Sequence, residues 1–317
     1  MASLVGKTPM VEIRYRFRGE EKSVFAKLEY YNPSGSIKDR IAEYIIAEAE
    51  RAGELKPGQA IVEVTSGNTG ISFSAMGARK GYPVHIFMPD WVSGERKLLM
   101  RMFGATVHEV SREEGGFMEA FRRADALSAE IGAFMPKQFE NMNNVYAHYY
   151  GTGAEILKQL PDVTDFVSGI GTGGTLMGVT KALREKNEVR ITAMEPDSLP
   201  LLRNSEATGE HKIEGIGDDF IPAIVDLEQI DNVVDVNDDD AIMMSSRLAT
   251  ELGLGVGISS GANFIASVLV NTDEGRRVVT VFPDDNKKYI STDLSRKIEK
   301  KTGMVNPEIE LLDVIRL

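Results

Sequence analysis

Lys38 is the residue of this sequence whose surroundings best suit covalent chemistry. It comes just after the turn residues Asn32-Pro33-Ser34-Gly35 and opens a helical pattern. A lysine at the start of a helix lies beside the positive end of the helix dipole, which disfavours the ammonium form and favours the nucleophilic amine. Such an amine can hold an aldehyde as a Schiff base.

Two later runs of small polar residues could bind the rest of such a molecule. The run Thr65-Ser66-Gly67-Asn68-Thr69-Gly70 is typical of an anion-binding loop. The run Gly171-Thr172-Gly173-Gly174-Thr175 follows the apolar, strand-like segment 165–170 and precedes a helical pattern, as a phosphate-binding loop does. An aldehyde and a phosphate on one molecule indicate pyridoxal 5′-phosphate as the cofactor.

The composition narrows the class of protein. With 317 residues, 42% of them hydrophobic and 26% charged, the chain suits two globular domains. It holds no apolar run near the roughly 18 residues that a membrane span needs. The formal net charge of -12 repels nucleic-acid phosphates and anionic membrane surfaces. We therefore expect small-molecule chemistry, with no nucleic-acid or membrane partner.

Cysteine and histidine usage excludes several kinds of site. The sequence has no cysteine, which excludes disulfides, thiolate metal ligands and a cysteine nucleophile. Its four histidines, His85, His108, His148 and His211, lack the spacing of a zinc motif. We expect each to be a surface or packing residue, and we expect no metal site. The N-terminus lacks the charged start and apolar run of a signal peptide, which predicts a cytoplasmic protein.

Val- and Ile-rich runs alternate with helix-length amphipathic segments along the chain. This alternation predicts an α/β fold with mostly parallel sheets that are covered on both faces. The expected strands are 60–64, 83–88, 105–110, 165–167, 190–194 and 277–282. A helix over 71–80 should end at Gly81. Several strands end at clusters of Gly, Pro, Ser or Asp, where open α/β sheets bind their ligands.

Seven ordered motifs, which follow an opening Gly6-Lys7-Thr8-Pro9, resemble those of one enzyme family and run nearly to the end of the chain. They are 32–40, 65–70, 138–141, 171–175, 214–217, 257–261 and 289–292. In these motifs the chain is similar to the cysteine synthases. These are β-replacing pyridoxal-phosphate enzymes with the tryptophan-synthase-β-like fold.

The resemblance implies an architecture and a set of partners. Two three-layer α/β domains are expected: a smaller one over 35–145 that closes on the substrate, and a larger one over 1–34 and 146–317 that binds the cofactor phosphate. No Pro- or Ser-rich hinge marks the border, for which Gly151-Thr152-Gly153 is the best candidate. A homodimer that acts on small amino acids is expected. Because relatives grip the C-terminal tail of a serine acetyltransferase, such an enzyme is a candidate partner.

The resemblance also implies roles for the residues in the motifs. Lys38 would be the Schiff-base lysine and afterwards the base that takes the substrate's α-proton. Asn68 would hydrogen-bond the ring hydroxyl of the cofactor. Ser259 would face the pyridine nitrogen with a hydroxyl, which suits β-elimination to an aminoacrylate. The substrate carboxylate would be bound by Thr65, Ser66, Thr69 and Gln138. The phosphate would be bound by Gly171, Thr172, Gly173, Gly174 and Thr175.

The sequence departs from the family at Asp218-Asp219, where relatives have small residues. Because this loop closes over the substrate's Cβ, we expect one carboxylate to enter the reaction space as a catalytic residue; the alternative is a helix-capping or solvated pair. A carboxylate ~4 Å from an anion costs on the order of 4 kcal/mol at an effective dielectric of about 20, which disfavours phosphoserine and hydrosulfide. It could also activate water. The run Pro283-Asp284-Asp285-Asn286 is likewise acidic, with no contact assigned.

These observations predict β-replacement at Cβ of cysteine or an activated serine, through an aminoacrylate intermediate. Sulfide would be the nucleophile in cysteine synthesis, or the leaving group when L-cysteine is converted to serine or a thioether. One alternative is a catalytically weak relative that mainly binds serine acetyltransferase; the intact Lys38, Asn68 and Ser259 argue against it. Another is a serine/threonine dehydratase, which shares the fold but fits the runs 138–141 and 289–292 poorly.

Overall fold

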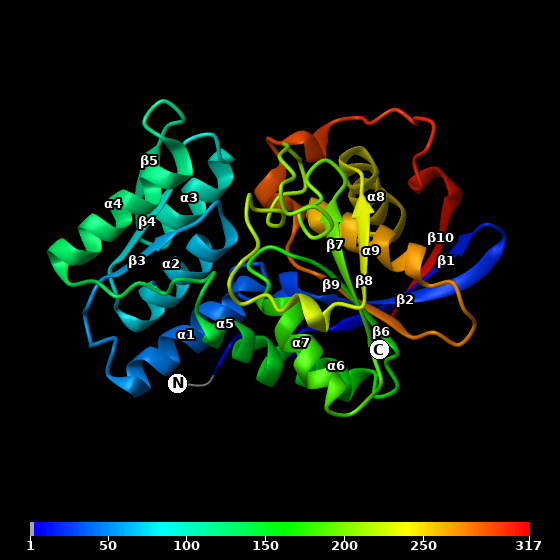
Figure 1. The fold of residues 1–317 in the computed structure, drawn as a ribbon, viewed down its shortest axis with the longest axis horizontal. Helices are drawn as coiled ribbons and strands as arrows, with labels where there is room; N and C mark the ends of the chain where they lie inside the picture. Colours follow the sequence, from blue (N-terminus) through cyan, green and yellow to red (C-terminus); the bar gives the residue numbers. More distant parts are fainter. Residues whose placement is uncertain (1–2) are drawn as a thin grey trace.

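The fold is organised around two β-sheets, which lie side by side in Figure 1. A computed structural model describes residues 3–317. The smaller sheet has three strands in the order β3-β4-β5, and the larger sheet has seven in the order β10-β1-β2-β9-β6-β7-β8. No helix within these residues is long and apolar enough to cross a membrane.

The smaller sheet is parallel and has helices on both faces. Its strands are β3 (Ile61–Val64), β4 (Val84–Pro89) and β5 (Thr106–Val110). Alternate strand residues pack on α1 (Lys38–Ala52), α2 (Asn68–Lys80) and α3 (Gly94–Met102). The residues between them face α4 (Gly116–Ile131) on the other side. As expected from the sequence, α2 ends at Gly81, whose φ is 80°.

The larger sheet is parallel except at one edge. Its parallel strands are β2 (Glu20–Leu28), β9 (Val278–Phe282), β6 (Asp165–Gly169), β7 (Arg190–Pro196) and β8 (Asn232–Val236). The edge strands β1 (Met10–Phe17) and β10 (Ile309–Arg316) are antiparallel to their neighbours. The six expected strands are all present, and the mostly parallel α/β class is confirmed.

Helices cover both faces of the larger sheet. One face carries α6 (Ala154–Gln159) and α7 (Gly174–Arg184), and the other carries α8 (Asp238–Leu252) and α9 (Ile258–Val270). The expected border, Gly151-Thr152-Gly153, lies in a π-helical turn (His148–Gly153) that joins α5 (Met142–Ala147) to α6. It is therefore helical rather than an open hinge. The bounds of the two domains stay a prediction.

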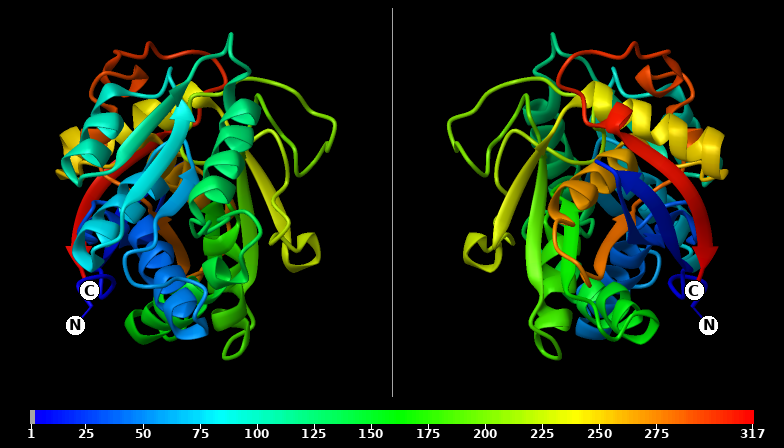
Figure 2. Two further views of the ribbon diagram at one scale, coloured as in Figure 1. Left: turned by 90° about the vertical axis from the view of Figure 1, so that its left-hand side faces the viewer. Right: turned by 90° about the vertical axis from the view of Figure 1, so that its right-hand side faces the viewer.

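A long segment, residues 197–231, connects β7 to β8 with no helix beyond one 3-10 turn (Leu227–Gln229). In the side views it is the yellow-green loop that projects from the body of the protein (Figure 2). Loops of this length within a compact fold are uncommon and are usually functional.

A buried ionic network joins α1 to the larger sheet, two residues after Lys38. Both nitrogens on one edge of the Arg40 guanidinium donate to the Glu29 carboxylate, at 2.6 and 2.8 Å, and two further bonds of 2.9 Å reach Glu155. The Lys27 ammonium lies 2.8 Å from Glu155. Burial raises the pKa of the Glu29 carboxyl, but the Arg40 and Lys27 charges outweigh it and hold that pKa below its usual value. The network fixes where α1 begins.

We predict that Glu29→Gln lowers the free energy of unfolding of the apo-protein by about 3–5 kcal/mol, because it leaves the buried Arg40 charge without its main partner. The matched control is Asp162→Asn, which breaks an exposed pair with Arg277 and should leave stability nearly unchanged. Urea unfolding measures both variants. Equal midpoints for the two would show that the network does not support the fold.

Candidate active site

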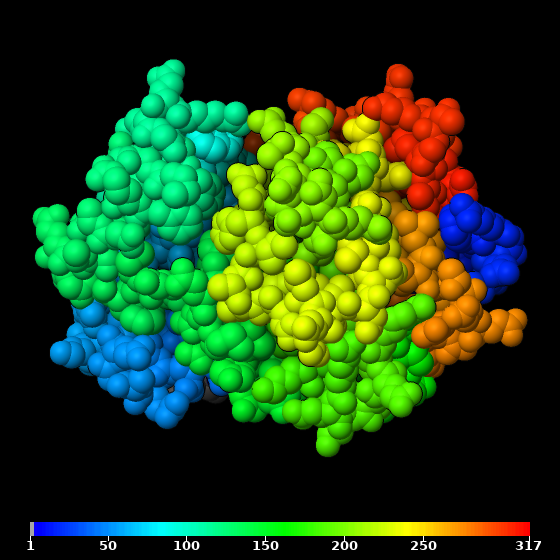
Figure 3. Space-filling model, in the orientation of Figure 1, coloured from blue at the N-terminus to red at the C-terminus, as the bar shows by residue number. Residues whose placement is uncertain are grey.

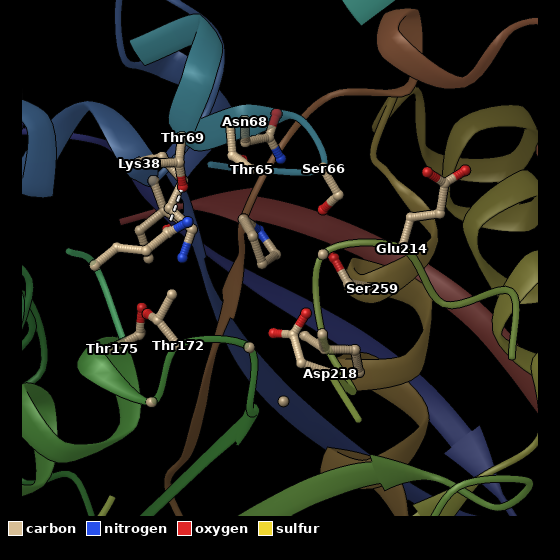
Figure 4. A pocket seen from close by; sticks show the side chains of 18 of the residues that line it. Lys38, Thr65, Ser66, Asn68, Thr69, Thr172, Thr175, Glu214, Asp218 and Ser259 are labelled. Atoms are coloured by element: carbon tan, nitrogen blue, oxygen red, sulfur yellow. Dashed lines mark hydrogen bonds between the residues drawn. The ribbon is translucent and has the colours of Figure 1, made fainter. Parts of the chain in front are cut away.

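One pocket between the two sheets brings together most of the residues singled out in the sequence. Those that line it are Lys38, Thr65, Ser66, Asn68, Thr69, Gln138, Gly171, Thr172, Gly173, Thr175, Asp218 and Ser259. Gly174 and Asp219 are not among the lining residues. The labelled side chains come from both halves of the molecule and, apart from Glu214, whose carboxyl points away, they surround a common space (Figure 4).

Four helices begin at this pocket. α1 begins at Lys38, α2 at Asn68, α7 at Gly174, and α9 at Ile258, one residue before Ser259. The first amides of a helix have no carbonyl one turn earlier to bind, and the helix dipole places positive charge there. The pocket is therefore suited to bind anionic groups, such as a phosphate and a carboxylate, at separate helix starts.

Lys38 is the half-buried first residue of α1, as the sequence predicted. Burial lowers the pKa of its amine to about 8, while the nearby Asp218 and Asp284 carboxyls act in the opposite direction. The largest cause is therefore loss of contact with water, rather than the helix start invoked from the sequence. A substantial fraction of the amine is neutral near pH 8 and can act as a nucleophile.

The glycines of the loop before α7 are required by close packing. Gly173 has φ 86°, and a Cβ there would lie 2.3 Å from the side chain of Val225. A Cβ on Gly174 would lie 1.8 Å from the side-chain oxygen of Asn144. The Asn144 amide also donates to the Thr172 hydroxyl at 2.9 Å. The loop is thus held from behind, and its amides remain free to face the pocket.

The loop before α2 is built from interlocking polar side chains. The Thr69 hydroxyl donates to the side-chain oxygen Oε1 of Gln138 at 2.6 Å, and the Thr65 hydroxyl accepts from the Gly67 amide at 3.0 Å. Ser66 points into the pocket (Figure 4). These groups surround the first amides of α2, where a carboxylate would bind.

Asp284, to which the sequence gave no contact, is 1% exposed and lies behind Asn68, a residue that lines the pocket. One of its carboxyl oxygens accepts from the Asn68 amide at 2.6 Å and from the Tyr289 hydroxyl. Burial raises the pKa of this carboxyl. The Asn68 carbonyl oxygen is buried and has no hydrogen-bond partner among residues 3–317. The neighbouring Asp285 caps a 3-10 turn through the Lys287 amide.

Asp218 and Asp219, the two aspartates at which the sequence departs from the family, have different surroundings. Asp218 is half-buried and lines the pocket; burial raises the pKa of its carboxyl, and the Lys38 and His211 charges oppose that rise. Asp219 is exposed and lines only the adjoining entrance. The solvated alternative therefore describes Asp219, while Asp218 is the carboxylate beside Lys38.

The entrance lies between the smaller half and the 197–231 segment. It is lined by Trp91 and Arg112 on one side and by residues 209–219 on the other. In the space-filling view, the yellow-green surface of this segment faces the cyan and green surface of the smaller half across a hollow (Figure 3).

Several residues that hold the site were missed from the sequence. Arg96, buried at the start of α3, donates to the Ser66 carbonyl at 2.9 Å and pairs with Glu214 across the entrance. His148 lies behind the phosphate-type loop, with Nε2 3.3 Å from the Thr175 hydroxyl. His148 was expected to be a packing residue, and no sequence pattern signals either contact. No group of three or more His, Cys, Asp or Glu within residues 3–317 could hold a metal ion.

The residues present fit pyridoxal phosphate. The pocket combines a lysine whose pKa is lowered to about 8, a side-chain amide oxygen of Asn68 that has no partner among residues 3–317 and can accept from a ring hydroxyl, and the first amides of α7. Ser259, 4% exposed at the start of α9, also lines it and offers a hydroxyl to a ring nitrogen. A phosphate, a ring and an aldehyde each have a complementary group.

Comparison with known proteins agrees with this fit. The family model described as "Pyridoxal-phosphate dependent enzyme" matches residues 1–284. A cysteine synthase of Staphylococcus aureus is 42% identical over 299 residues, which are 93% of this chain and 96% of that protein. Cysteine synthase B of Campylobacter jejuni is 43% identical over 298 residues, 93% and 97% of the two chains.

Solved structures extend the agreement to the fold. A hydrogen sulfide-producing enzyme of Fusobacterium nucleatum is 48% identical, with a TM-score of 0.95 over 99% of this chain and 97% of that one. Another structure with the same enzyme name, also 48% identical with a TM-score of 0.94 over the same shares, is an aspartate-to-asparagine variant in complex with an α-aminoacrylate intermediate. The predictions of family, fold class, cofactor and β-replacement with sulfide chemistry are confirmed. The chain belongs to the pyridoxal-phosphate dependent enzyme family, among its cysteine synthase-like members.

Proposed function

We propose that this enzyme works mainly in the direction of sulfide release, converting L-cysteine to serine or a thioether, with Asp218 assisting the incoming nucleophile. The observation that carries the proposal is the carboxyl of Asp218 in the pocket, beside Lys38. When bound, the cofactor supplies the electron sink that lets one substituent leave Cβ and another add.

Lys38 acts in the first part of the reaction, in which the substrate's α-proton is removed. Its amine, with a pKa of about 8, is the group that attaches the cofactor and then accepts the proton from the substrate's Cα. The first amides of α2 and the Gln138 amide would hold the substrate carboxylate so that this proton faces Lys38, and the Thr69 hydroxyl would turn its hydrogen from the side-chain oxygen of Gln138 to the carboxylate. Closure of the smaller half over this loop would exclude water.

Asp218 acts in the second part of the reaction, in which the incoming nucleophile adds at Cβ. A carboxylate beside Cβ can take the proton of an incoming water or thiol, and it repels an anionic nucleophile such as hydrosulfide. Water or a thiol then competes more effectively than hydrosulfide for addition at Cβ. The relatives support this direction, since the 48% identical Fusobacterium protein is named for hydrogen sulfide production. Its aspartate-to-asparagine variant holds an intermediate, as expected where a carboxylate serves the later step.

The oligomeric state, the location in the cell and the protein partner stay predictions. We expect a homodimer, from the resemblance and from the prevalence of twofold oligomers. A cytoplasmic location and a serine acetyltransferase partner are likewise expectations from the sequence. The binding-partner role is the weaker alternative, because a pure scaffold has no need of a pocket lysine with a lowered pKa.

Lys38→Ala is expected to abolish turnover and covalent attachment of the cofactor, because no other amine replaces it. Borohydride trapping followed by mass spectrometry should label Lys38 in the parent and nothing in the variant, while Lys56→Ala, at an exposed lysine, behaves as the parent. In the parent apo-protein, capture of added pyridoxal phosphate should accelerate as pH rises through about 8, as the amine loses its proton. Trapped cofactor in Lys38→Ala would refute the assignment.

Thr69→Ala should raise the KM for L-cysteine by roughly tenfold to a hundredfold, the effect of losing a hydrogen bond to a charged group. The affinity for pyridoxal phosphate, measured by fluorescence titration, should hardly change. Ser66→Ala is expected to act in the same direction, and Thr69→Ser should restore most of the parental KM. Parallel loss of cofactor and substrate binding would contradict the separation of roles.

Asp218→Asn should slow the second half-reaction by about 10²–10⁴-fold, the range for removal of a general base. Stopped-flow absorbance after mixing with L-cysteine would show one rapid release of sulfide and then a persistent altered spectrum. Asp219→Asn, at the exposed neighbour, is the matched control and should turn over as the parent does. If both variants consume cysteine at the parental rate, the aspartates are structural.

A further inference from the structure

His211 lies in the 197–231 segment, six residues before Gly217 in the chain. Its Nε2 atom is 2.7 Å from the carbonyl oxygen of Gly217. A carbonyl oxygen only accepts, so Nε2 carries the hydrogen and donates it. The imidazole therefore binds the backbone of the residue that immediately precedes Asp218.

Gly217 is held from both sides. Its amide donates to the carbonyl of Ile170, at the end of β6, over 2.9 Å. Its φ is 69°, and a Cβ on it would lie 2.6 Å from the Nε2 atom of His211 and 3.1 Å from Pro196. The imidazole thus packs directly against the glycine backbone. The peptide that sets the direction of the Asp218 side chain is fixed between the phosphate-type loop and His211.

His211 is itself anchored to a rigid element. The amide of Lys212 donates to Asp238, the first residue of α8, over 2.9 Å. The Nδ1 atom of His211 and the second carboxyl oxygen of Asp238 are both buried, and neither has a hydrogen-bond partner among residues 3–317. A continuous set of contacts therefore runs from the start of α8 through His211 to Gly217.

We propose that His211 is a positioning residue, which holds the Gly217 carbonyl and thereby keeps the carboxyl of Asp218 beside Lys38. The inference rests on the proposed function of Asp218. The loop that carries Asp218 has no regular secondary structure to orient it, and the exposed Asp219 shows that a neighbouring side chain already faces the entrance. Without the imidazole, Asp218 would be free to turn toward water in the same way.

The test compares three variants of the holoenzyme with the parent. His211→Ala should slow the second half-reaction at least tenfold and leave the cofactor affinity and the first release of sulfide unchanged. His211→Gln, whose amide can also donate to the carbonyl, should restore much of the rate. Arg203→Ala is the matched control: it removes an ion pair of the same segment with Asp235, 2.8 Å long, and Arg203 is not among the residues that line the pocket or its entrance. It should behave as the parent.

Two further measurements separate positioning from a general effect on stability. His211→Ala combined with Asp218→Asn should be no slower than Asp218→Asn alone, because both changes remove the same contribution. In the apo-protein, His211→Ala should shift the pH dependence of pyridoxal phosphate capture in the same direction as Asp218→Asn. Asp218 raises the pKa of Lys38, so its loss moves that dependence to lower pH. Should the alanine variant not fold, His211→Asn, whose amide is shorter, replaces it.

The outcomes distinguish this inference from the proposed function. If Asp218→Asn slows the second half-reaction and His211→Ala does not, His211 has no positioning role and the function of Asp218 stands. If Asp218→Asn itself has no effect, the proposed function fails. Additive losses in the double variant would also overturn the inference, because His211 would then act independently of Asp218.

Discussion

The rest of the site depends on one constraint: four helices start at the same pocket. α1, α2, α7 and α9 each bring the positive end of a helix dipole to the space between the sheets. Parallel sheets make this convergence possible, because β3 and β6 run toward the pocket and the chain turns there into a helix. An anionic cofactor and an anionic substrate can then be bound largely by backbone groups, which leaves Lys38 free for chemistry.

Two carboxyls, those of Asp284 and Asp218, modify this positive environment. Asp284 is tied to Asn68 and Tyr289, so it orients the amide that faces the cofactor ring. No hydrogen bond or ion pair joins Asp218 to another side chain within residues 3–317, and Asp218 faces the pocket that Lys38 also lines. Both raise the pKa of the Lys38 amine against the effect of burial. A pocket that would otherwise attract any anion is thereby made less favourable to a second one, such as hydrosulfide, once the substrate is in place.

The sequence predicted the parallel α/β class, the six expected strands, the start of α1 at Lys38 and the gathering of the small polar runs, because these follow from local patterns. It could not choose between Asp218 and Asp219, since which of two adjacent side chains faces the pocket depends on the backbone at Gly217, which tertiary contacts set. The sequence marked Asp284 as part of an acidic run but could not assign its contact, because its partner Asn68 is 216 residues away in the chain. His148 and His211 were taken for packing residues because each contacts backbone or hydroxyl groups of a loop, not a recognisable motif.

The central claim is that Asp218 makes this pocket better at releasing sulfide than at incorporating it. The most direct measurement is the ratio of two kcat/KM values for the parent enzyme: sulfide release from L-cysteine, and cysteine formation from O-acetylserine at a fixed sulfide concentration. The account predicts a ratio above one that falls when Asp218 is replaced by the small neutral residue alanine. A parent enzyme that forms cysteine faster than it consumes it, with a ratio unmoved by Asp218→Ala, would contradict the account.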